Sequence, residues 1–161
     1  MERDPIDGLR EALTGLLHEL GMRTAFVGQT CDEPAGCART LVLLRDGELI
    51  DNLTYPIAGT PTAHIVEHGA CFHSAGVSEM YPQDESLPFF GGESYFGVAV
   101  LDPSGRRIGH VGVLDDKPFA DPKELETRLR RFANELVDWL AAPALSSGST
   151  TSGKVVSTVH D

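Results

Sequence analysis

The stretch ESYFGVAVLDPSGRRIGHVGVLDD, residues 93–116, decides the fold class. Residues 95–101 and 107–114 are rich in β-branched and aromatic side chains, a composition that is typical of strands. Between them, Asp102-Pro103-Ser104-Gly105 has the composition of a tight turn. The stretch therefore predicts an antiparallel hairpin.

Further strand-forming segments precede this hairpin. Residues 24–28 and 40–44 are short β-favouring runs on either side of a loop, and a third run follows at residues 49–55. Arg45-Asp46-Gly47-Glu48 predicts a hairpin between the second and third runs, because Asp-Gly suits a turn that needs positive φ. Successive hairpins predict a sheet that is mostly antiparallel.

Amphipathic helices are predicted at both ends of this run of strands. The N-terminal helix begins at its cap, Asp4, and carries a leucine stripe that ends at Leu20. The C-terminal helix begins at its cap, Asp121, and carries an apolar stripe from Leu125 to Leu140. Because the helices lie outside the run of strands, the pattern predicts an α+β fold and not a doubly wound parallel sheet.

The composition limits the classes of partner. The chain has 161 residues, with 13 Lys and Arg against 24 Asp and Glu and a formal net charge of −11. This charge disfavours nucleic acid and anionic membranes as partners, because both are bound mainly through Lys and Arg. The sequence has neither an apolar run of about 20 residues nor a signal peptide, so we expect a cytoplasmic protein that binds no membrane.

Two segments differ from the rest in composition. Residues 56–92 are rich in Pro and Gly and show little periodicity, apart from a short predicted helix at residues 61–67. Long irregular segments of this kind often bind ligands, so we expect the binding site here. Residues 142–161 are rich in Ser, Gly and Thr, which predicts a flexible tail or linker after a domain at residues 5–141.

The order of these segments resembles a GAF domain, the small-ligand sensor module found with bacterial histidine kinases and diguanylate cyclases. The segments that carry the resemblance are LGMRTAFVG at residues 20–28, RDGELIDN at 45–52, YPIAGTP at 55–61 and the hairpin at 93–116. One residue departs from the pattern. Thr62 stands where related modules often carry a cysteine.

The resemblance implies an antiparallel sheet of about six strands, with the N- and C-terminal helices packed on one side and ligand-side loops on the other. It implies a regulatory, non-catalytic domain that senses a small molecule in bacterial signal transduction, and it neither names the ligand nor requires a cofactor. A signalling kinase or cyclase is the expected output partner. The leucines of the terminal helices further predict a homodimer through those helices.

The predicted ligand site combines aromatic and polar residues of loops and strand ends. Such a mixture supplies the apolar wall and the few hydrogen-bonding groups of a small-molecule pocket. The predicted ligand-binding residues are Tyr55, Thr60, His64, Phe72, Tyr81, Glu93, Ser94 and Tyr95. Each of them also suits ordinary packing, so a module that binds no small molecule and only scaffolds partners is an open alternative.

A metal or haem site is a second alternative for the same region. His64 and His68 are four residues apart, so one helical turn brings them onto one face. Cys71 and His73 alternate, so an extended segment projects them to one side. These four residues are the candidate ligands for zinc, or for haem through an axial histidine, although their spacing matches no established pattern.

A thiol enzyme is the third alternative. The three cysteines are Cys31 and Cys37, which lie in one loop as free thiols or as a redox-labile pair, and Cys71. One branch of the GAF fold reduces free methionine sulfoxide with a cysteine shortly before the penultimate strand. The corresponding residues 88–94 contain no cysteine, so the sequence predicts no enzyme and no catalytic residue.

His110 lies in the last predicted strand. Ile108 and Gly112 share its face by two-residue alternation. We expect a core-edge or helix-facing histidine with a satisfied ring nitrogen.

Overall fold

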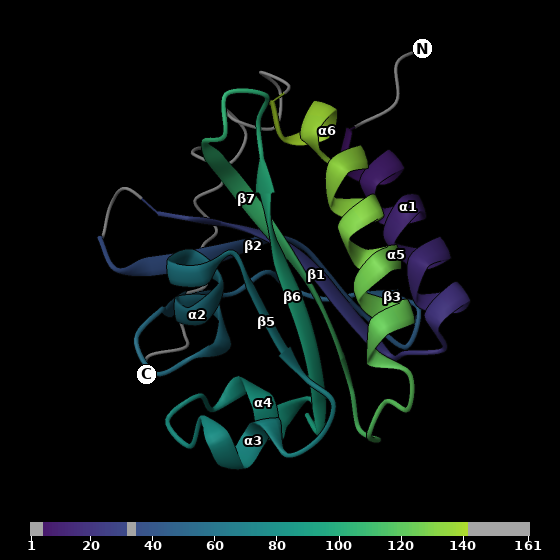
Figure 1. Ribbon diagram of the computed structural model, residues 1–161, viewed down its shortest axis with the longest axis vertical. Helices are drawn as coiled ribbons and strands as arrows, with labels where there is room; N and C mark the ends of the chain where they lie inside the picture. Colours follow the sequence, from purple (N-terminus) through teal and green to yellow (C-terminus); the bar gives the residue numbers. More distant parts are fainter. Residues whose placement is uncertain (1–4, 32–34, 142–161) are drawn as a thin grey trace.

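The computed structural model describes residues 5–31 and 35–141, and one antiparallel sheet forms its centre (Figure 1). The strand order is β3-β2-β1-β7-β6-β5, and the short strand β4 also pairs with β2. The strands are β1 (Thr24–Thr30), β2 (Cys37–Arg45), β3 (Glu48–Leu49), β4 (Thr54–Pro56), β5 (Ala70–His73), β6 (Ser94–Leu101) and β7 (Arg107–Asp115). All strand pairs in the described part of the chain are antiparallel.

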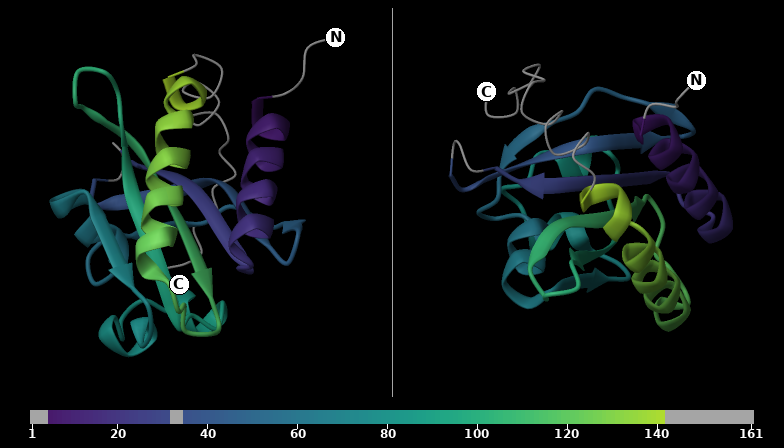
Figure 2. Two further views of the ribbon diagram at one scale, coloured as in Figure 1. Left: turned by 45° about the vertical axis from the view of Figure 1, so that its right-hand side comes forward. Right: turned by 90° about the horizontal axis from the view of Figure 1, so that it is seen from above.

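Helices cover both faces of the sheet (Figures 1 and 2). The helices are α1 (Pro5–Leu20), α2 (Pro61–His68), α3 (Val77–Met80), α4 (Ser86–Phe89), α5 (Pro122–Glu135) and α6 (Val137–Ala141). The long terminal helices α1 and α5, with α6, pack on one face, and the short helices α2, α3 and α4 lie on the other. The predicted α+β architecture is confirmed, with seven strands where about six were expected.

The larger core lies between the sheet and the terminal helices. The predicted leucine stripes form it: Leu9 and Leu13 of α1 and Leu125 and Leu129 of α5 are all fully buried. The two ends of the domain meet directly, because the indole of Trp139 lies against Gly8. A Cβ at Gly8 would collide with this ring, so the close approach depends on the absence of a side chain.

The cap of α5 is as predicted, and two ion pairs lie on the exposed surface of this helix. Asp121 accepts a hydrogen bond from the amide of Glu124. Arg128 pairs with Glu124 at 2.8 Å, and Arg130 pairs with Glu126 at 3.0 Å. The predicted cap at Asp4 and the predicted tail at residues 142–161 lie outside the described residues.

The predicted third strand at residues 49–55 is wrong, because it is interrupted. Its ends form β3 and β4, and the strand is interrupted at residues 50–53, although Ile50 and Leu53 still make backbone hydrogen bonds to β2. Asn52 is the physical reason. Its Nδ2 donates to the carbonyl of Leu41 at 3.1 Å, and its Oδ1 accepts from the hydroxyl of Thr40 at 2.8 Å. This side chain replaces the backbone partner that a continuous strand would supply.

The predicted C-terminal helix is also interrupted, at Leu136. The amide of Leu136 contacts the carbonyls of both Phe132 and Ala133, which tightens the last turn of α5 and separates it from α6. The strand β5 and the helices α3 and α4 were not predicted. No helix in the described ranges combines the length and the apolar character needed to span a membrane.

Candidate functional site

Two adjoining hollows lie on the face of the sheet opposite the terminal helices. The inner cavity has a volume of about 40 Å³, and the outer groove has a volume of about 740 Å³. The residues that line both hollows are Leu43, Leu53, Tyr55, Asp84, Ser86 and Phe90. The groove falls in the size range of sites for small organic molecules, roughly 300–1,000 Å³.

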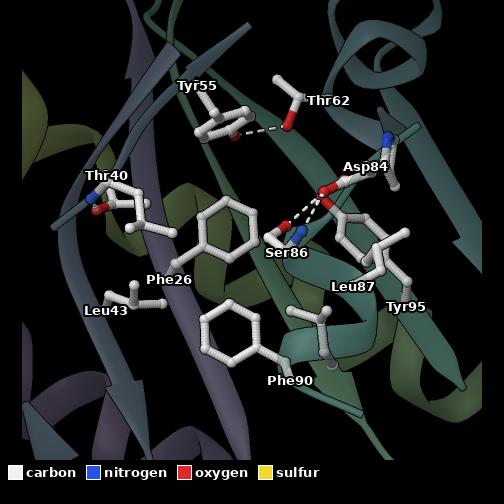
Figure 3. Close-up of a pocket in the computed structure, with 13 residues that line it drawn as sticks. Phe26, Thr40, Leu43, Tyr55, Thr62, Asp84, Ser86, Leu87, Phe90 and Tyr95 are labelled. Atoms are coloured by element: carbon white, nitrogen blue, oxygen red, sulfur yellow. Dashed lines mark hydrogen bonds between the residues drawn. The ribbon is translucent and has the colours of Figure 1, made fainter. Parts of the chain in front are cut away.

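Apolar side chains from the sheet and from α4 enclose the inner cavity (Figure 3). The sheet supplies Phe26, Leu43 and Leu114, and the α4 region supplies Leu87 and Phe90. All five side chains are buried. They face this side because alternate residues of a strand point to opposite faces, while their neighbours on β1 and β2 enter the helix-side core.

Tyr95 lies on the sheet surface in this cavity. Its ring extends over two glycines that face each other across β6 and β7: a Cβ at Gly97 or at Gly112 would lie only 3.3 Å from Tyr95 Oη. Tyr95 is 3% exposed, and its hydroxyl makes no hydrogen bond of normal geometry within the described residues, although the hydroxyl of Thr62 lies close enough to act on its pKa. Burial raises the pKa of Tyr95 well above its usual value, so the phenol is neutral. The cavity therefore contains one unused hydroxyl.

Tyr55 and Thr62 form a second polar group in the cavity. Tyr55 Oη and Thr62 Oγ1 lie 2.7 Å apart, and this bond links β4 to the first turn of α2 (Figure 3). Pro61 begins α2, where its missing amide costs nothing, and the next residue, Thr62, is buried. Burial raises the pKa of Tyr55, which keeps its hydroxyl protonated.

Asp84 lies where the cavity meets the groove. Its Oδ1 accepts hydrogen bonds from the amide and the hydroxyl of Ser86, which fixes the carboxylate just before α4 (Figure 3). Burial raises the pKa of Asp84, and its hydrogen bonds to Ser86 offset part of this effect. Asp84 is the one charged residue among those that line the inner cavity. The interior of the site thus combines a carboxylate with a neutral hydroxyl and carries no positive charge.

The outer groove has an apolar floor and a charged rim. Phe90 and the exposed Phe89 form part of its wall, and the guanidinium of Arg45 lies 5.5 Å from the centre of the Phe90 ring. Arg45 Nη1 is buried without a partner in the part of the chain that the structure describes. Acidic side chains outnumber this cation on the rim, where Asp51, Asp84 and Glu85 line the groove.

Comparison with solved structures identifies the fold of this domain. No family model and no curated protein matches the sequence. Among solved structures, the GAF domain of a phosphoenolpyruvate-protein phosphotransferase from Acinetobacter matches with a TM-score of 0.59 and 9% identity, over 93% of this chain and 98% of that chain. This chain has the GAF fold.

Two other structures with similar folds have different functions. A type II free methionine-R-sulfoxide reductase from Thermoplasma acidophilum matches with a TM-score of 0.62 and 16% identity, over 83% of this chain and 90% of that chain. A bacteriophytochrome from the photosynthetic bacterium R. palustris matches with a TM-score of 0.65 and 12% identity, over 92% of this chain but only 36% of that chain. At these identities the likeness establishes the fold and not the ligand.

Within the GAF fold, three of the predicted ligand residues lie at the two hollows. Tyr55 and Tyr95 line the inner cavity, and Thr60 lines the groove. Two more support the surrounding loops. Ser94 is fully buried and donates to the carbonyl of Lys117 at 2.9 Å, while Glu93 accepts from the amide of Gly76 at 2.8 Å.

The other predicted ligand residues lie elsewhere in the GAF fold. Phe72 belongs to the helix face, where it packs on Phe96 and under the guanidinium of Arg130. Tyr81 lies beside Cys71 and His73 and lines neither hollow. His64 is exposed on α2, and it is also outside both linings.

The four candidate metal ligands form two separate contacts. The rings of His64 and His68 lie 4.5 Å apart on α2, as predicted from their spacing. Cys71 Sγ and His73 Nε2 each contact Tyr81 Oη, at 3.5 and 3.3 Å. Burial raises the pKa of the Cys71 thiol and lowers the pKa of His73. Across residues 5–31 and 35–141, no group of three or more His, Cys, Asp or Glu side chains could hold a metal ion.

The three cysteines lie outside both linings of the site. Within the described residues none of the three forms a disulfide, and Cys71 is buried. Cys31 and Cys37 approach across their loop as predicted, but through the backbone: the amide of Cys31 donates to the carbonyl of Cys37 at 2.8 Å.

The prediction for His110 is wrong in both its face and its bonding. The side chain lies on the face of the sheet that carries the two hollows, edge-on to Phe26 with ring centres 5.9 Å apart. Its neighbour Gly109 faces α6 on the opposite side. His110 is fully buried, and neither ring nitrogen has a hydrogen-bond partner among the described residues. Burial, with a smaller contribution from the charge of Arg107, lowers the pKa of His110 to about 4, so the ring is neutral.

Sequence reasoning missed the residues around α4. Asp84, Ser86, Leu87 and Phe90 all line the inner cavity, but they belong to an irregular segment without a readable period. Phe26 was missed although strand alternation carries a signal for it. Its β1 neighbours Ala25 and Val27 point to the helix side, which leaves Phe26 on the ligand side.

Proposed function

We propose that this GAF-fold domain is a regulatory sensor that binds a small organic molecule in the groove and inner cavity. The observation that carries the proposal is the unpartnered hydroxyl of Tyr95 at the base of an apolar, enclosed site. A buried hydroxyl without a partner costs about 1–3 kcal/mol, and a ligand that bonds to it recovers this free energy. Groups of this kind are retained at sites of function.

We further propose that the domain is not an enzyme. The similar reductase from Thermoplasma acidophilum raises the alternative of a thiol mechanism. Such a mechanism needs a thiolate at the pocket, whereas Cys31, Cys37 and Cys71 are absent from the linings of both hollows. The raised pKa of Cys71 further disfavours its thiolate at neutral pH.

The proposed place of the domain is cytoplasmic bacterial signal transduction, as a homodimer that regulates a kinase or cyclase. The exposed large hydrophobic side chains within the described ranges are Leu49, Met80, Phe89 and Leu101. The leucines of the terminal helices predict an exposed apolar strip for a dimer interface. The described parts of α1, α5 and α6 have no such strip. The homodimer is therefore proposed without an exposed apolar strip on these helices. Light scattering after size-exclusion chromatography tests it, and a monomer at millimolar concentration would exclude it.

Native mass spectrometry of freshly purified protein, with an absorbance spectrum, tests the proposed function. We expect a bound organic molecule, and its loss or weakening when Phe90→Trp fills the junction of the two hollows. The control is Leu101→Trp, which enlarges an exposed apolar side chain that lines neither hollow. An apo mass, with no compound from the cell extract retained on re-exposure, counts against the sensor. A haem spectrum or a bound zinc mass would favour the metal alternative.

A further inference from the structure

The chemistry of the cavity also restricts the class of ligand, given the function proposed above. The polar atoms available to a ligand in the inner cavity are the hydroxyl of Tyr95 and the carboxylate of Asp84. The other polar groups are already bonded to one another: Tyr55 with Thr62, and Thr40 with Asn52. The site therefore presents to its occupant one carboxylate, which only accepts hydrogen bonds, and one hydroxyl, which accepts or donates.

The electrostatics of the entrance act in the same direction. A ligand reaches the cavity from the groove, past the carboxylate of Asp84, which lines both hollows. The groove rim adds Asp51 and Glu85. Among the described residues, Arg45 is the single cation of the groove, and the lining of the inner cavity contains none, so burying an anion there beside the carboxylate of Asp84 is costly.

The sizes of the two hollows fix how a ligand divides between them. The inner cavity of about 40 Å³ admits only a small group, whereas the groove of about 740 Å³ holds the body of an organic molecule. Leu43, Leu53 and Phe90 line the junction, so the part of the ligand that passes between the hollows is apolar.

We infer that the ligand is an apolar organic molecule without negative charge, whose body lies in the groove and whose end donates hydrogen bonds inside the cavity. This end is an amine, an amide or a hydroxyl, and it binds Tyr95 Oη and the Asp84 carboxylate. The inference rests on the proposed function and names the ligand chemistry of that same site.

Titration of the ¹⁵N-labelled chain with three probes of similar skeleton tests the inference by NMR. The probes are 2-phenylethylamine, phenylacetamide and phenylacetate, which end in a cation, a neutral donor and an anion. We expect the amine and the amide to shift the amide signals of Phe26, Asp84 and Tyr95, with a dissociation constant at least tenfold below that of phenylacetate.

Variants of the site show which residues cause the preference for the amine and the amide over phenylacetate. Asp84→Asn is expected to weaken the amine at least tenfold and to reduce the discrimination against phenylacetate. Glu79→Gln is the matched control, because it removes the same charge from an exposed position of α3 that lines neither hollow, and we expect a change below twofold. Tyr95→Phe keeps the ring and removes the hydroxyl, and we expect several-fold weaker binding of the amine and the amide.

The outcomes separate this inference from the proposed function. Tighter binding of phenylacetate, lost in Arg45→Gln, would overturn the ligand class and keep the site, because Arg45 carries the unpartnered guanidinium nitrogen of the groove. Equal effects of Asp84→Asn and Glu79→Gln would also overturn it. If no probe shifts these signals and no molecule co-purifies, the inference and the sensor proposal both fail.

Discussion

Tyr95 and His110 are buried on the same face of the sheet, and each has polar atoms without partners among the described residues. Their surroundings differ. Tyr95 lines the inner cavity, so a ligand can reach its hydroxyl, whereas His110 is enclosed by Phe26 and Gly28 and lines neither hollow. The missing hydrogen bonds therefore affect ligand binding at Tyr95, and they affect the pH dependence of stability at His110.

Tyr95→Phe is expected to stabilise the ligand-free protein while it weakens ligand binding. Removing a buried hydroxyl without a partner avoids its desolvation cost, so we expect the free energy of unfolding to rise by about 1 kcal/mol. Urea unfolding measures this change. A loss of stability comparable to that of a broken hydrogen bond would show instead that the hydroxyl has a structural partner.

His110→Leu is expected to flatten the pH dependence of stability between pH 6.5 and 4. The folded protein holds the pKa of His110 at about 4, whereas an unfolded histidine has a pKa of about 6.5. Within this window the unfolded chain binds a proton that the folded chain does not. Stability is therefore complete above pH 6.5 and falls as the pH decreases, by about 3 kcal/mol in total.

Urea unfolding from pH 7 to pH 4 compares the native chain with this variant. Carboxylates contribute equally to both curves, so the difference between the curves reports His110. His18→Gln, at an exposed position of α1, is the control and should keep the native slope. Parallel curves for the native chain and His110→Leu would contradict a neutral buried imidazole.

At the scale of elements, the sequence predicts what periodicity and turn chemistry determine. The hairpin at residues 93–116 and the stripes of α1 and α5 are present, because alternation and helical spacing specify a buried face. The site is only partly predicted. Tyr55 and Tyr95 are strand residues with readable positions, whereas Asp84 is positioned by a side-chain bond to Ser86 that no period encodes.

Asn52→Ala is expected to lower the free energy of unfolding by about 1 kcal/mol, because the interruption between β3 and β4 depends on this side chain. The variant leaves the carbonyl of Leu41 without its donor and the hydroxyl of Thr40 without its acceptor. Urea unfolding measures the loss, with the exposed neighbour Asp51→Ala as the control. Equal stabilities of the two variants would mean that the backbone holds this turn without Asn52.

At the scale of the whole molecule, the two ends of the domain are joined where Trp139 of α6 lies against Gly8 of α1. The same helix contains Gly15, where an added Cβ would meet nothing within 4 Å. Comparing alanine substitutions at Gly8 and Gly15 separates the effect of helix propensity from the effect of packing between the two ends of the domain. Alanine favours both positions as a helix former by about 1 kcal/mol over glycine, but only at Gly8 does it collide with a neighbour.

Gly15→Ala is therefore expected to stabilise the protein by up to about 1 kcal/mol, whereas Gly8→Ala should be less stable than Gly15→Ala by at least about 1 kcal/mol, because overpacking displaces the indole. Thermal unfolding measures the difference. The emission of Trp139, the single tryptophan, reports the displacement. Equal gains from both substitutions with unchanged emission would rule out a tight junction.

The order of the strands also places short strands at the margins of the sheet. One margin is β5, with four residues, and the other consists of β3 and β4, with two and three residues. A long edge strand with unpaired backbone groups is a template for strand addition by another chain, whereas a short edge strand is a poor template. The long strands β1, β6 and β7 are paired on both sides. The sheet is thereby protected against edge-to-edge aggregation at the concentrations that the titrations require.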